Sequence, residues 1–176
     1  PSGLRGELFF CQLFSEPDAG SDLASVRTRA IRRGDSSWVV SGQKVWTSVA
    51  HVADYGMLLC RTDPDATRHS GITCFLVPMH ADGVRVRPIR QITGGSAFNE
   101  VWLDEVVIDD AWRLGEVHGG WSIARSTLGT ERISVPLGGP HAMPSRLVDL
   151  ARHHGLSDDP LVRQQLADLV VRRRIA

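Results

Sequence analysis

The sequence predicts a mainly β fold with appended helices, and two patterns along the chain support this fold class. Up to about residue 115, short apolar runs are separated by Gly, Pro and Asp, which is typical of a β-sandwich or a small barrel. After Gly119-Gly120 the apolar residues recur at helical spacing. Hydrophobic residues make up 42% of the 176 residues, which is enough for one core and a small appendage. We therefore expect a β-domain over residues 1–117 and a helical region over residues 118–176.

The predicted strands follow one another at short intervals. Apolar residues alternate with arginine over Val26–Ile31, which is the two-residue period of a half-buried strand. A turn at residues 34–36 and the apolar run Trp38–Val40 complete a hairpin over Ser25–Gly42. The other expected strands are Glu7–Phe14, Val45–Ser48, Tyr55–Arg61, Ile72–Val77, Val84–Ile89, Phe98–Leu103 and Val106–Ile108.

Three helices are predicted after the β-domain. The first starts near Gly120, and the second is an amphipathic segment over Arg146–His154 that ends at Gly155 in a C-cap position. The third opens with Asp159 as its N-cap and Pro160 at the first helical position. Helices of this kind cannot bury their apolar faces unaided, so we expect the helical region to be a truncated domain.

Composition narrows the class of protein. Twenty basic and twenty acidic residues give a net charge of zero, which argues against binding to nucleic acid or an anionic membrane. No apolar run approaches the roughly 18 residues of a membrane span, and the N-terminus lacks the layout of a signal peptide. Three cysteines in apolar runs (Cys11, Cys60, Cys74) suggest buried thiols in a reducing compartment, and the seven histidines show no metal-ligand spacing. We expect a soluble, cytoplasmic chain that holds no metal.

Two short segments offer polar groups beside apolar strands. Ser15–Asp22 (S-E-P-D-A-G-S-D) is a turn whose backbone N–H groups and hydroxyls suit a polar ligand edge or a phosphate, although a plain surface turn is the alternative. Gly42–Ser48 (G-Q-K-V-W-T-S) places Trp46 beside two hydroxyls, which suits a planar heteroaromatic ligand. Either segment is weak evidence by itself.

Together with a third segment, these motifs resemble the acyl-CoA dehydrogenase family. Ser15–Asp22 resembles the S/T-E-P-x-A-G-S-D signature, and Gly42–Ser48 resembles the G-x-K-x-W-x-T/S signature about 25 residues downstream. Phe98–Val106 is similar to the F-x-E-V-x-x-D-x-V strand pair of the same family. Order and spacing match over residues 8–135. The resemblance implies the family's middle β-domain and the first helices of its C-terminal domain.

The resemblance also implies an activity. Family members use FAD to remove two hydrogens from Cα and Cβ of an acyl-CoA thioester, and they pass the electrons to an electron-transfer flavoprotein. We expect this segment to be inactive alone, because the acyl pocket needs other helices, and to belong to a homo- or hetero-oligomer when intact. The alternatives are a same-fold flavin oxidase or monooxygenase, and a non-catalytic subunit of a heteromeric acyl-CoA dehydrogenase.

Individual site residues follow from the matched motifs. The resemblance places the CoA part of the substrate at Ser21 and makes Arg132 a further substrate-binding residue, and it expects the usual Gly of the turn where this sequence has Asp18. Hydrogen-bond donors at the pyrimidine edge would stabilise an anionic reduced flavin. The residues implied to hold FAD are Gln12, Phe14 and Ser15 on the pyrimidine side, Trp46 and Thr47 beside the ring system, and Ser48 near N5.

The base that removes the α-proton must be a carboxylate in a dry pocket. In this family it is a Glu on a late C-terminal loop or on the first long helix after the β-domain. Here that helix carries Glu131, three residues after Leu128 and four before Val135, which predicts a position on the apolar face. Glu131 is the candidate base. The alternatives are a structural Glu paired with a neighbour such as Arg132, and a late-loop Glu outside residues 1–176.

Three prolines after Glu131 depart from the Ala- and Gly-rich helix that is usual in the family. An interior proline costs a helix about 3 kcal/mol. We therefore expect the helix that carries Glu131 to end or bend soon after it, near Pro136, Pro140 and Pro144.

Overall fold

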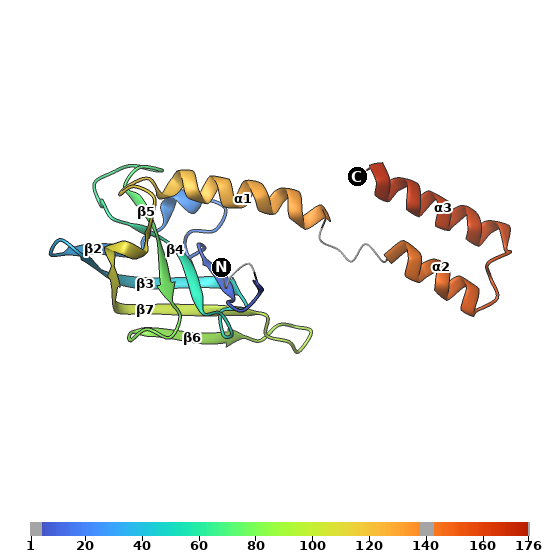
Figure 1. The fold of residues 1–176 in the computed structure, drawn as a ribbon, viewed down its shortest axis with the longest axis horizontal. Coiled ribbons are helices and arrows are strands. Elements are labelled where there is room, and N and C mark those ends of the chain that lie inside the picture. The colour runs from blue at the N-terminus through green and yellow to red at the C-terminus, as the bar shows by residue number, and fades with distance from the viewer. Residues whose placement is uncertain (1–4, 138–142, 176) are drawn as a thin grey trace. The chain divides into compact units, whose positions relative to one another are not determined.

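Strands come first and helices last, as the hydrophobic pattern predicts (Figure 1). The computed structural model describes residues 5–137 and 143–175. The chain divides into two compact units, residues 1–125 and 126–176. The described elements are β1 (Phe10–Leu13), the 3-10 turn Leu23–Ser25, β2 (Arg29–Arg33), β3 (Ser37–Ser48), β4 (Tyr55–Arg61), β5 (Ile72–Pro78), β6 (Val84–Ile89), β7 (Phe98–Asp109), the 3-10 turn Asp110–Trp112, β8 (Arg113–Leu114), α1 (Gly120–Leu137), α2 (Met143–His153) and α3 (Pro160–Ile175).

The strands of the first unit form one sheet with the order β6-β7-β3-β2-β4-β5-β8, and β1 pairs with β4 in parallel. The predicted hairpin is confirmed, because β2 and β3 pair antiparallel from Arg29↔Ser41 to Arg33↔Ser37. In Figure 1 the strands β3, β7 and β6 lie side by side, in agreement with this order.

Two long strands were expected as shorter pieces. The structure joins the return strand of the hairpin and Val45–Ser48 into β3, and it joins Phe98–Leu103 and Val106–Ile108 into β7. The pairing of β3 with β7 has register shifts between Val40 and Gly42 and between Lys44 and Thr47. A β-bulge breaks the two-residue period without ending the strand, so the sequence pattern suggested strand ends at these points.

The core of the first unit lies between the two halves of this folded sheet. Trp38 from β3 packs against Phe75 from β5 with ring centroids 5.5 Å apart. Val40 and Val101 approach from β3 and β7, and Leu58 approaches from β4; all three are fully buried. Because both halves supply apolar side chains to one cluster, the unit is a β-sandwich, which confirms the predicted fold class.

A polar network closes one end of the sandwich. The carboxylate of Asp110 accepts hydrogen bonds from the indole N–H of Trp38 at 2.7 Å and from the Arg113 guanidinium at 3.0 Å. These hydrogen bonds from Arg113 and Trp38 lower the pKa of Asp110 to about 2. The network ties the short turn after β7 to a core tryptophan.

Helices α1 and α3 begin where the sequence predicts, whereas α2 begins at Met143, before the predicted Arg146, and ends at His153. A Cβ on Gly120 would lie 2.6 Å from the carbonyl carbon of Thr73, so the start of α1 lies very close to the β5 backbone. Gly155 follows α2 with a φ of +67°, as a C-cap glycine does. The Asp159 carboxylate accepts from the N–H groups of Leu161 and Val162 at 2.8 and 3.1 Å, which confirms the predicted N-cap of α3.

The prolines fit these helix ends. Helix α1 ends at Leu137, one residue after Pro136, and Pro144 lies in the first turn of α2, where proline is tolerated. Pro140 lies outside the described residues. In the described part of the chain, no helix has the length and apolar character needed to cross a bilayer.

Candidate functional site

The turn after β1 carries the first site motif. Glu16 and Ala19 exchange two backbone hydrogen bonds, of 2.9 and 3.1 Å, which close the turn around Pro17 and Asp18. Asp18 does not adopt a positive φ, so the turn forms without the left-handed residue that a glycine would favour there. The Asp18 carboxylate lies 3.5 Å from the Arg27 guanidinium, and both side chains are exposed.

The bulge in β3 decides which way the second motif faces. In an unbroken strand Trp46 would share the inner face with Lys44, because side chains alternate. The register shift between Lys44 and Thr47 adds one residue, so Lys44 and Thr47 both point inward and Trp46 points outward with 61% of its surface exposed. Trp46 has a φ of +60°, which is uncommon for a large side chain. The bulge therefore holds a large, exposed aromatic side chain on a strained backbone.

The structure separates the predicted flavin residues into two groups. Gln12, Trp46 and Ser48 are exposed, and Ser15 is half-buried. Phe14 and Thr47 are buried, so their side chains pack beneath this surface. The Oγ1 atom of Thr47 has no hydrogen-bond partner in the described part of the chain, and its carbonyl oxygen accepts from Asn99 Nδ2 at 2.9 Å.

The backbone of Ser15 uses its carbonyl oxygen, but not its N–H, in a hydrogen bond within the described residues. Its carbonyl oxygen accepts from the Val45 N–H at 2.9 Å, which ties the turn to β3. The Ser15 N–H has no acceptor among the described residues. Ser15 is bonded to Val45, the residue before the exposed Trp46, and a free amide donor there fits the polar pyrimidine edge of a flavin, because that edge offers acceptors to backbone N–H groups.

A buried ion pair lies beneath this surface. Lys44 is 0% exposed, and its Nζ donates to Glu16 Oε1 at 2.8 Å and to the Phe14 carbonyl oxygen at 3.0 Å. The Glu16 carboxylate also accepts from the N–H groups of Arg27 and Thr28, at 2.7 and 3.0 Å. The partners of this pair therefore lie at Phe14, directly before the turn motif, and in the segment before β2.

Burial and pairing act in opposite directions on these two groups. Burial raises the pKa of Glu16, but the Lys44 charge and the hydrogen bonds outweigh it, so the pKa of Glu16 lies below its usual range. Burial also lowers the pKa of Lys44, and Glu16 opposes that shift. The nearby thiols of Cys60 and Cys74 stay neutral because burial raises the pKa of each to about 12. Glu16 is thus the anion that faces the ammonium.

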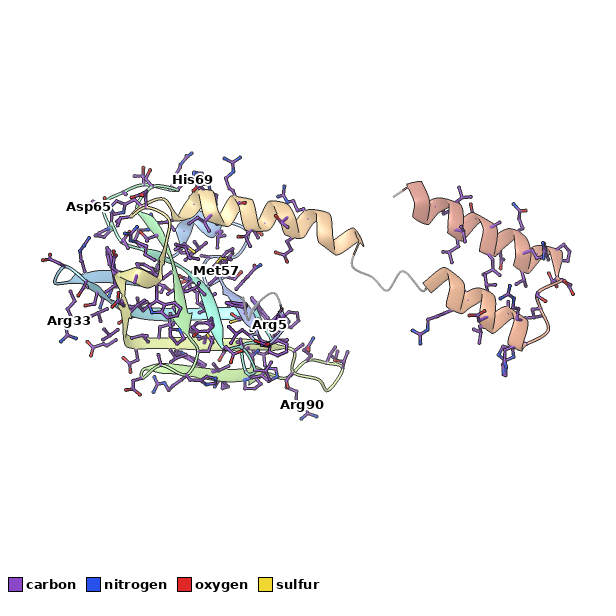
Figure 2. All side chains as sticks on the ribbon, viewed as in Figure 1. Arg5, Arg33, Met57, Asp65, His69 and Arg90 are labelled. Carbon is purple, nitrogen blue, oxygen red and sulfur yellow. The ribbon has the colours of Figure 1, made fainter. Side chains whose placement is uncertain are left out.

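A hollow of about 600 Å³ opens beside Asp22, the last residue of the turn motif. Its walls come from the segment before β2 and from the β4–β5 loop, on which Figure 2 labels His69. Arg61 holds the walls together by donating to the carbonyl oxygens of Ala24 and Ser70, both at 2.6 Å. Basic groups dominate the lining, which consists of Asp22, Ala24, Ser25, Arg27, Arg61, Arg68 and His69.

The remaining predicted site residues lie elsewhere. Ser21 is exposed in the turn next to the hollow. Glu131 and Arg132 lie on α1 and are exposed, although the sequence pattern placed Glu131 on an apolar face. Within residues 5–137 and 143–175, no group of three or more His, Cys, Asp or Glu side chains is arranged to hold a metal ion.

Sequence reasoning missed the ion pair and the basic hollow. One signal for the pair was available, since Lys44 is the only lysine among 20 basic residues and stands inside an apolar strand. The hollow had no such signal. Its arginines are scattered between positions 27 and 68, and only the fold brings them together.

A β-sandwich with a Ser-Glu-Pro turn beside a bulged, tryptophan-bearing strand agrees with the middle domain that the motif resemblance implies. The family model described as acyl-CoA dehydrogenase, middle domain, matches residues 11–111 of this chain. The chain belongs to the acyl-CoA dehydrogenase family, and the resemblance drawn from the three motifs is confirmed.

Two relatives from Mycobacterium tuberculosis illustrate this membership. The chain is 56% identical over 138 residues to acyl-CoA dehydrogenase FadE34, which is 78% of this chain and 19% of the relative. It is 46% identical over 160 residues to acyl-CoA dehydrogenase IpdE1, which is 89% of this chain and 41% of the relative. The chain therefore spans less than half the length of these relatives.

Solved structures support the same family membership. The steroid acyl-CoA dehydrogenase Tcur3481-Tcur3483 matches with a TM-score of 0.85 and 37% identity, over 99% of this chain and 46% of that one. The ChsE4-ChsE5 complex from Mycobacterium tuberculosis matches with a TM-score of 0.78 and 32% identity, over 99% of this chain and 47% of that one. The second of these structural neighbours is thus a complex of ChsE4 with ChsE5.

Proposed function

We propose that this chain is the flavin- and acyl-CoA-binding segment of an FAD-dependent acyl-CoA dehydrogenase. The observation that carries the proposal is the bulge in β3, which turns Trp46 and Ser48 outward, beside a Ser15 that is bonded to Val45 and whose N–H has no acceptor among the described residues. Gln12, Ser15, Trp46 and Ser48 would hold FAD, and Phe14 and Thr47 would support them from below. The chemistry that FAD supplies when bound is the acceptance of two electrons from the acyl chain.

The basic hollow supports acyl-CoA as the substrate. Coenzyme A carries several phosphate charges, and arginine binds phosphate with paired, charge-assisted hydrogen bonds. Arg27, Arg61 and Arg68 line the hollow, and Ser21 precedes its Asp22 wall. We place the nucleotide end of coenzyme A there. One structural neighbour is a steroid acyl-CoA dehydrogenase, which makes a CoA ester of a steroid acid the first bulky substrate to test.

Glu131 is the proposed base for the α-proton, with a Glu outside residues 1–176 as the alternative. An electron-transfer flavoprotein is the proposed acceptor, and a homo- or hetero-oligomer is the proposed assembly, because the ChsE4-ChsE5 neighbour is a complex of two different chains. The buried thiols of Cys11, Cys60 and Cys74 suit a reducing, cytoplasmic compartment.

The test is an absorbance experiment on the complete subunit that contains this segment, produced with any partner subunit. The protein is incubated with FAD, desalted, and titrated without oxygen with straight-chain and steroid acyl-CoAs. We expect bound flavin that bleaches with at least one acyl-CoA. Colourless protein would overturn the proposal. Bleaching that reverses in air with stoichiometric hydrogen peroxide would favour the oxidase alternative.

A matched pair of variants tests the base. Glu131→Gln should retain FAD, and its rate of flavin bleaching by acyl-CoA should fall about a hundredfold or more, since a positioned base accelerates proton transfer about 10²–10⁴-fold. The control is Glu105→Gln, an exposed glutamate of β7, which should bleach at the normal rate. Normal bleaching in the Glu131 variant would move the base to a Glu outside residues 1–176.

A further inference from the structure

The ion pair between Glu16 and Lys44 is a feature that the proposed function leaves unused. Its two side chains are 7% and 0% exposed. A buried ion pair is weak evidence for stability, because apolar side chains of similar volume often stabilise a core equally well. A role besides stability is therefore needed to explain this pair.

The second contact of Lys44 suggests that role. Its Nζ lies 3.0 Å from the carbonyl oxygen of Phe14, which belongs to the same peptide group as the Ser15 N–H. A hydrogen bond from an ammonium polarises a carbonyl more strongly than one from a neutral donor does. Polarisation of the carbonyl makes the N–H of the same peptide a better donor. That N–H has no acceptor among the described residues.

Glu16 keeps the ammonium in place. Its carboxylate is fixed by backbone N–H groups of Arg27 and Thr28 as well as by Lys44. The thiols of Cys60 and Cys74 are neutral, so Glu16 alone supplies the counter-charge among the groups facing Lys44. Without that counter-charge, a buried ammonium would be much less stable in its charged form.

The same pair also joins the turn motif Ser15–Asp22 to β3, the two segments that are proposed to hold the flavin. Glu16 follows Ser15 directly, and Lys44 precedes Trp46 by two residues. The Val45 N–H holds the Ser15 carbonyl oxygen at 2.9 Å. One ion pair and one backbone hydrogen bond therefore fix the turn against the bulge.

We propose that Lys44, held by Glu16, is a positioning residue that strengthens the Ser15 N–H as a donor to the pyrimidine end of the flavin and so favours the reduced cofactor. A reduced flavin carries more negative charge at that end than an oxidised one, so a stronger donor stabilises the reduced form preferentially. The inference rests on the proposed function, because it requires FAD beside Ser15.

The test compares the affinities of the complete subunit for oxidised and reduced FAD and measures the reduction potential of the bound flavin. Glu16→Gln with Lys44→Met removes both charges, so that neither remains buried alone. We expect the ratio of the reduced-FAD to the oxidised-FAD dissociation constant to rise about tenfold when the charge-assisted bond is lost. For a two-electron couple this lowers the potential by about 30 mV.

The matched control removes a different ion pair of the sandwich. Asp110→Asn with Arg113→Met deletes a pair that contacts the Trp38 indole and makes no contact with the Phe14–Ser15 peptide. This control should leave the ratio within about twofold of the wild type. An equal ratio in both double variants would overturn the proposal and leave Glu16–Lys44 a structural pair. Failure of the wild-type subunit to bind FAD would instead overturn the proposed function.

A second variant covers the case in which Lys44→Met does not fold. In Glu16→Gln with Lys44→Gln, two amides can hydrogen-bond to each other in the space of the ion pair. This variant also lacks the ammonium, so its potential should fall in the same direction. An unchanged potential in a folded, FAD-bound Gln pair would contradict the proposal.

Discussion

The β unit (residues 1–125) and the helical unit (residues 126–176) differ in how far their apolar side chains are exposed. In the β unit, Leu58, Phe75 and Val101 are 0% exposed within a single cluster. On α3, Leu161 and Val171 are 74% and 53% exposed. Among the described side chains of the helical unit, only Ala151 is a buried hydrophobic residue. The β unit thus contains its own core, whereas α2 and α3 leave large apolar side chains exposed.

The largest test of this difference removes one apolar side chain from each unit. Phe75→Ala should destabilise the β unit by about 3–5 kcal/mol, because it leaves a cavity beneath Trp38. Leu161→Ala should change the stability of the helical unit by less than about 0.5 kcal/mol, because its side chain is already exposed. Urea unfolding followed by tryptophan fluorescence reports on the β unit, since all five tryptophans precede Ser126.

Far-UV circular dichroism and hydrogen exchange of the α3 peptides report on the helical unit. Comparable losses of stability in Phe75→Ala and Leu161→Ala would contradict the difference between the two units. They would show that Leu161 is buried in the folded protein and that the helical unit has a core of its own.

Glycine substitutions should give the next largest difference in stability loss between the two units. Gly83 and Gly155 both have positive φ, at +86° and +67°. A Cβ on Gly83 would lie 2.2 Å from the Asp104 carbonyl oxygen, whereas one on Gly155 would meet nothing within 4 Å. Gly83→Ala should cost about 2–4 kcal/mol, from backbone strain and a clash together. Gly155→Ala should cost about 1 kcal/mol, from backbone strain alone. Equal losses of urea-unfolding stability in the two variants would mean that the β5–β6 turn, which contains Gly83, relaxes freely.

The smallest effects are expected from charges. The folded-state pKa of Asp110, about 2, lies below the usual value near 4, so the unfolded chain takes up its proton first as the pH falls. The stabilisation by Asp110 is therefore complete above about pH 5 and is lost between about pH 4 and pH 2. The difference in urea midpoint between wild type and Asp110→Asn should shrink over that window.

The matched charge in the helical unit is Asp168, which pairs with Arg172 at 2.7 Å in an exposed position. Asp168→Asn should change stability by no more than about 0.5 kcal/mol, because water and salt screen exposed pairs. A pH-independent difference for Asp110→Asn, or a larger effect for Asp168→Asn, would contradict this ranking of the two pairs.

Local patterns in the sequence predicted the fold class, the β2–β3 hairpin and the helix ends at Gly155 and Asp159. Each depends on residues close together in the chain, such as an alternating run or a capping side chain. The bulge in β3 could not be predicted this way. It is a relation between β3 and β7, and the local pattern around Val45 is compatible with an unbroken strand or with two short ones.

The candidate site remains a prediction at the level of single residues. The motifs nominate Ser15, Trp46 and Ser48 as flavin contacts, because their types and spacing match a family pattern. They did not separate outward Trp46 from inward Thr47, since that depends on the bulge. Nor did they find the Arg61 and Arg68 walls of the hollow, which meet only after β4 and β5 pair.

The burial of Lys44 also has a practical consequence for chemical labelling. It is the only lysine in residues 1–176, and in the folded β unit its side chain is inaccessible and hydrogen-bonded. Acylating reagents need an exposed, uncharged amine, so this side chain becomes reactive when the sandwich opens. The fraction of this segment acylated at Lys44 therefore reports the fraction of molecules in which the sandwich has opened. Mass spectrometry can measure that fraction in a crude mixture, without purification or an engineered probe.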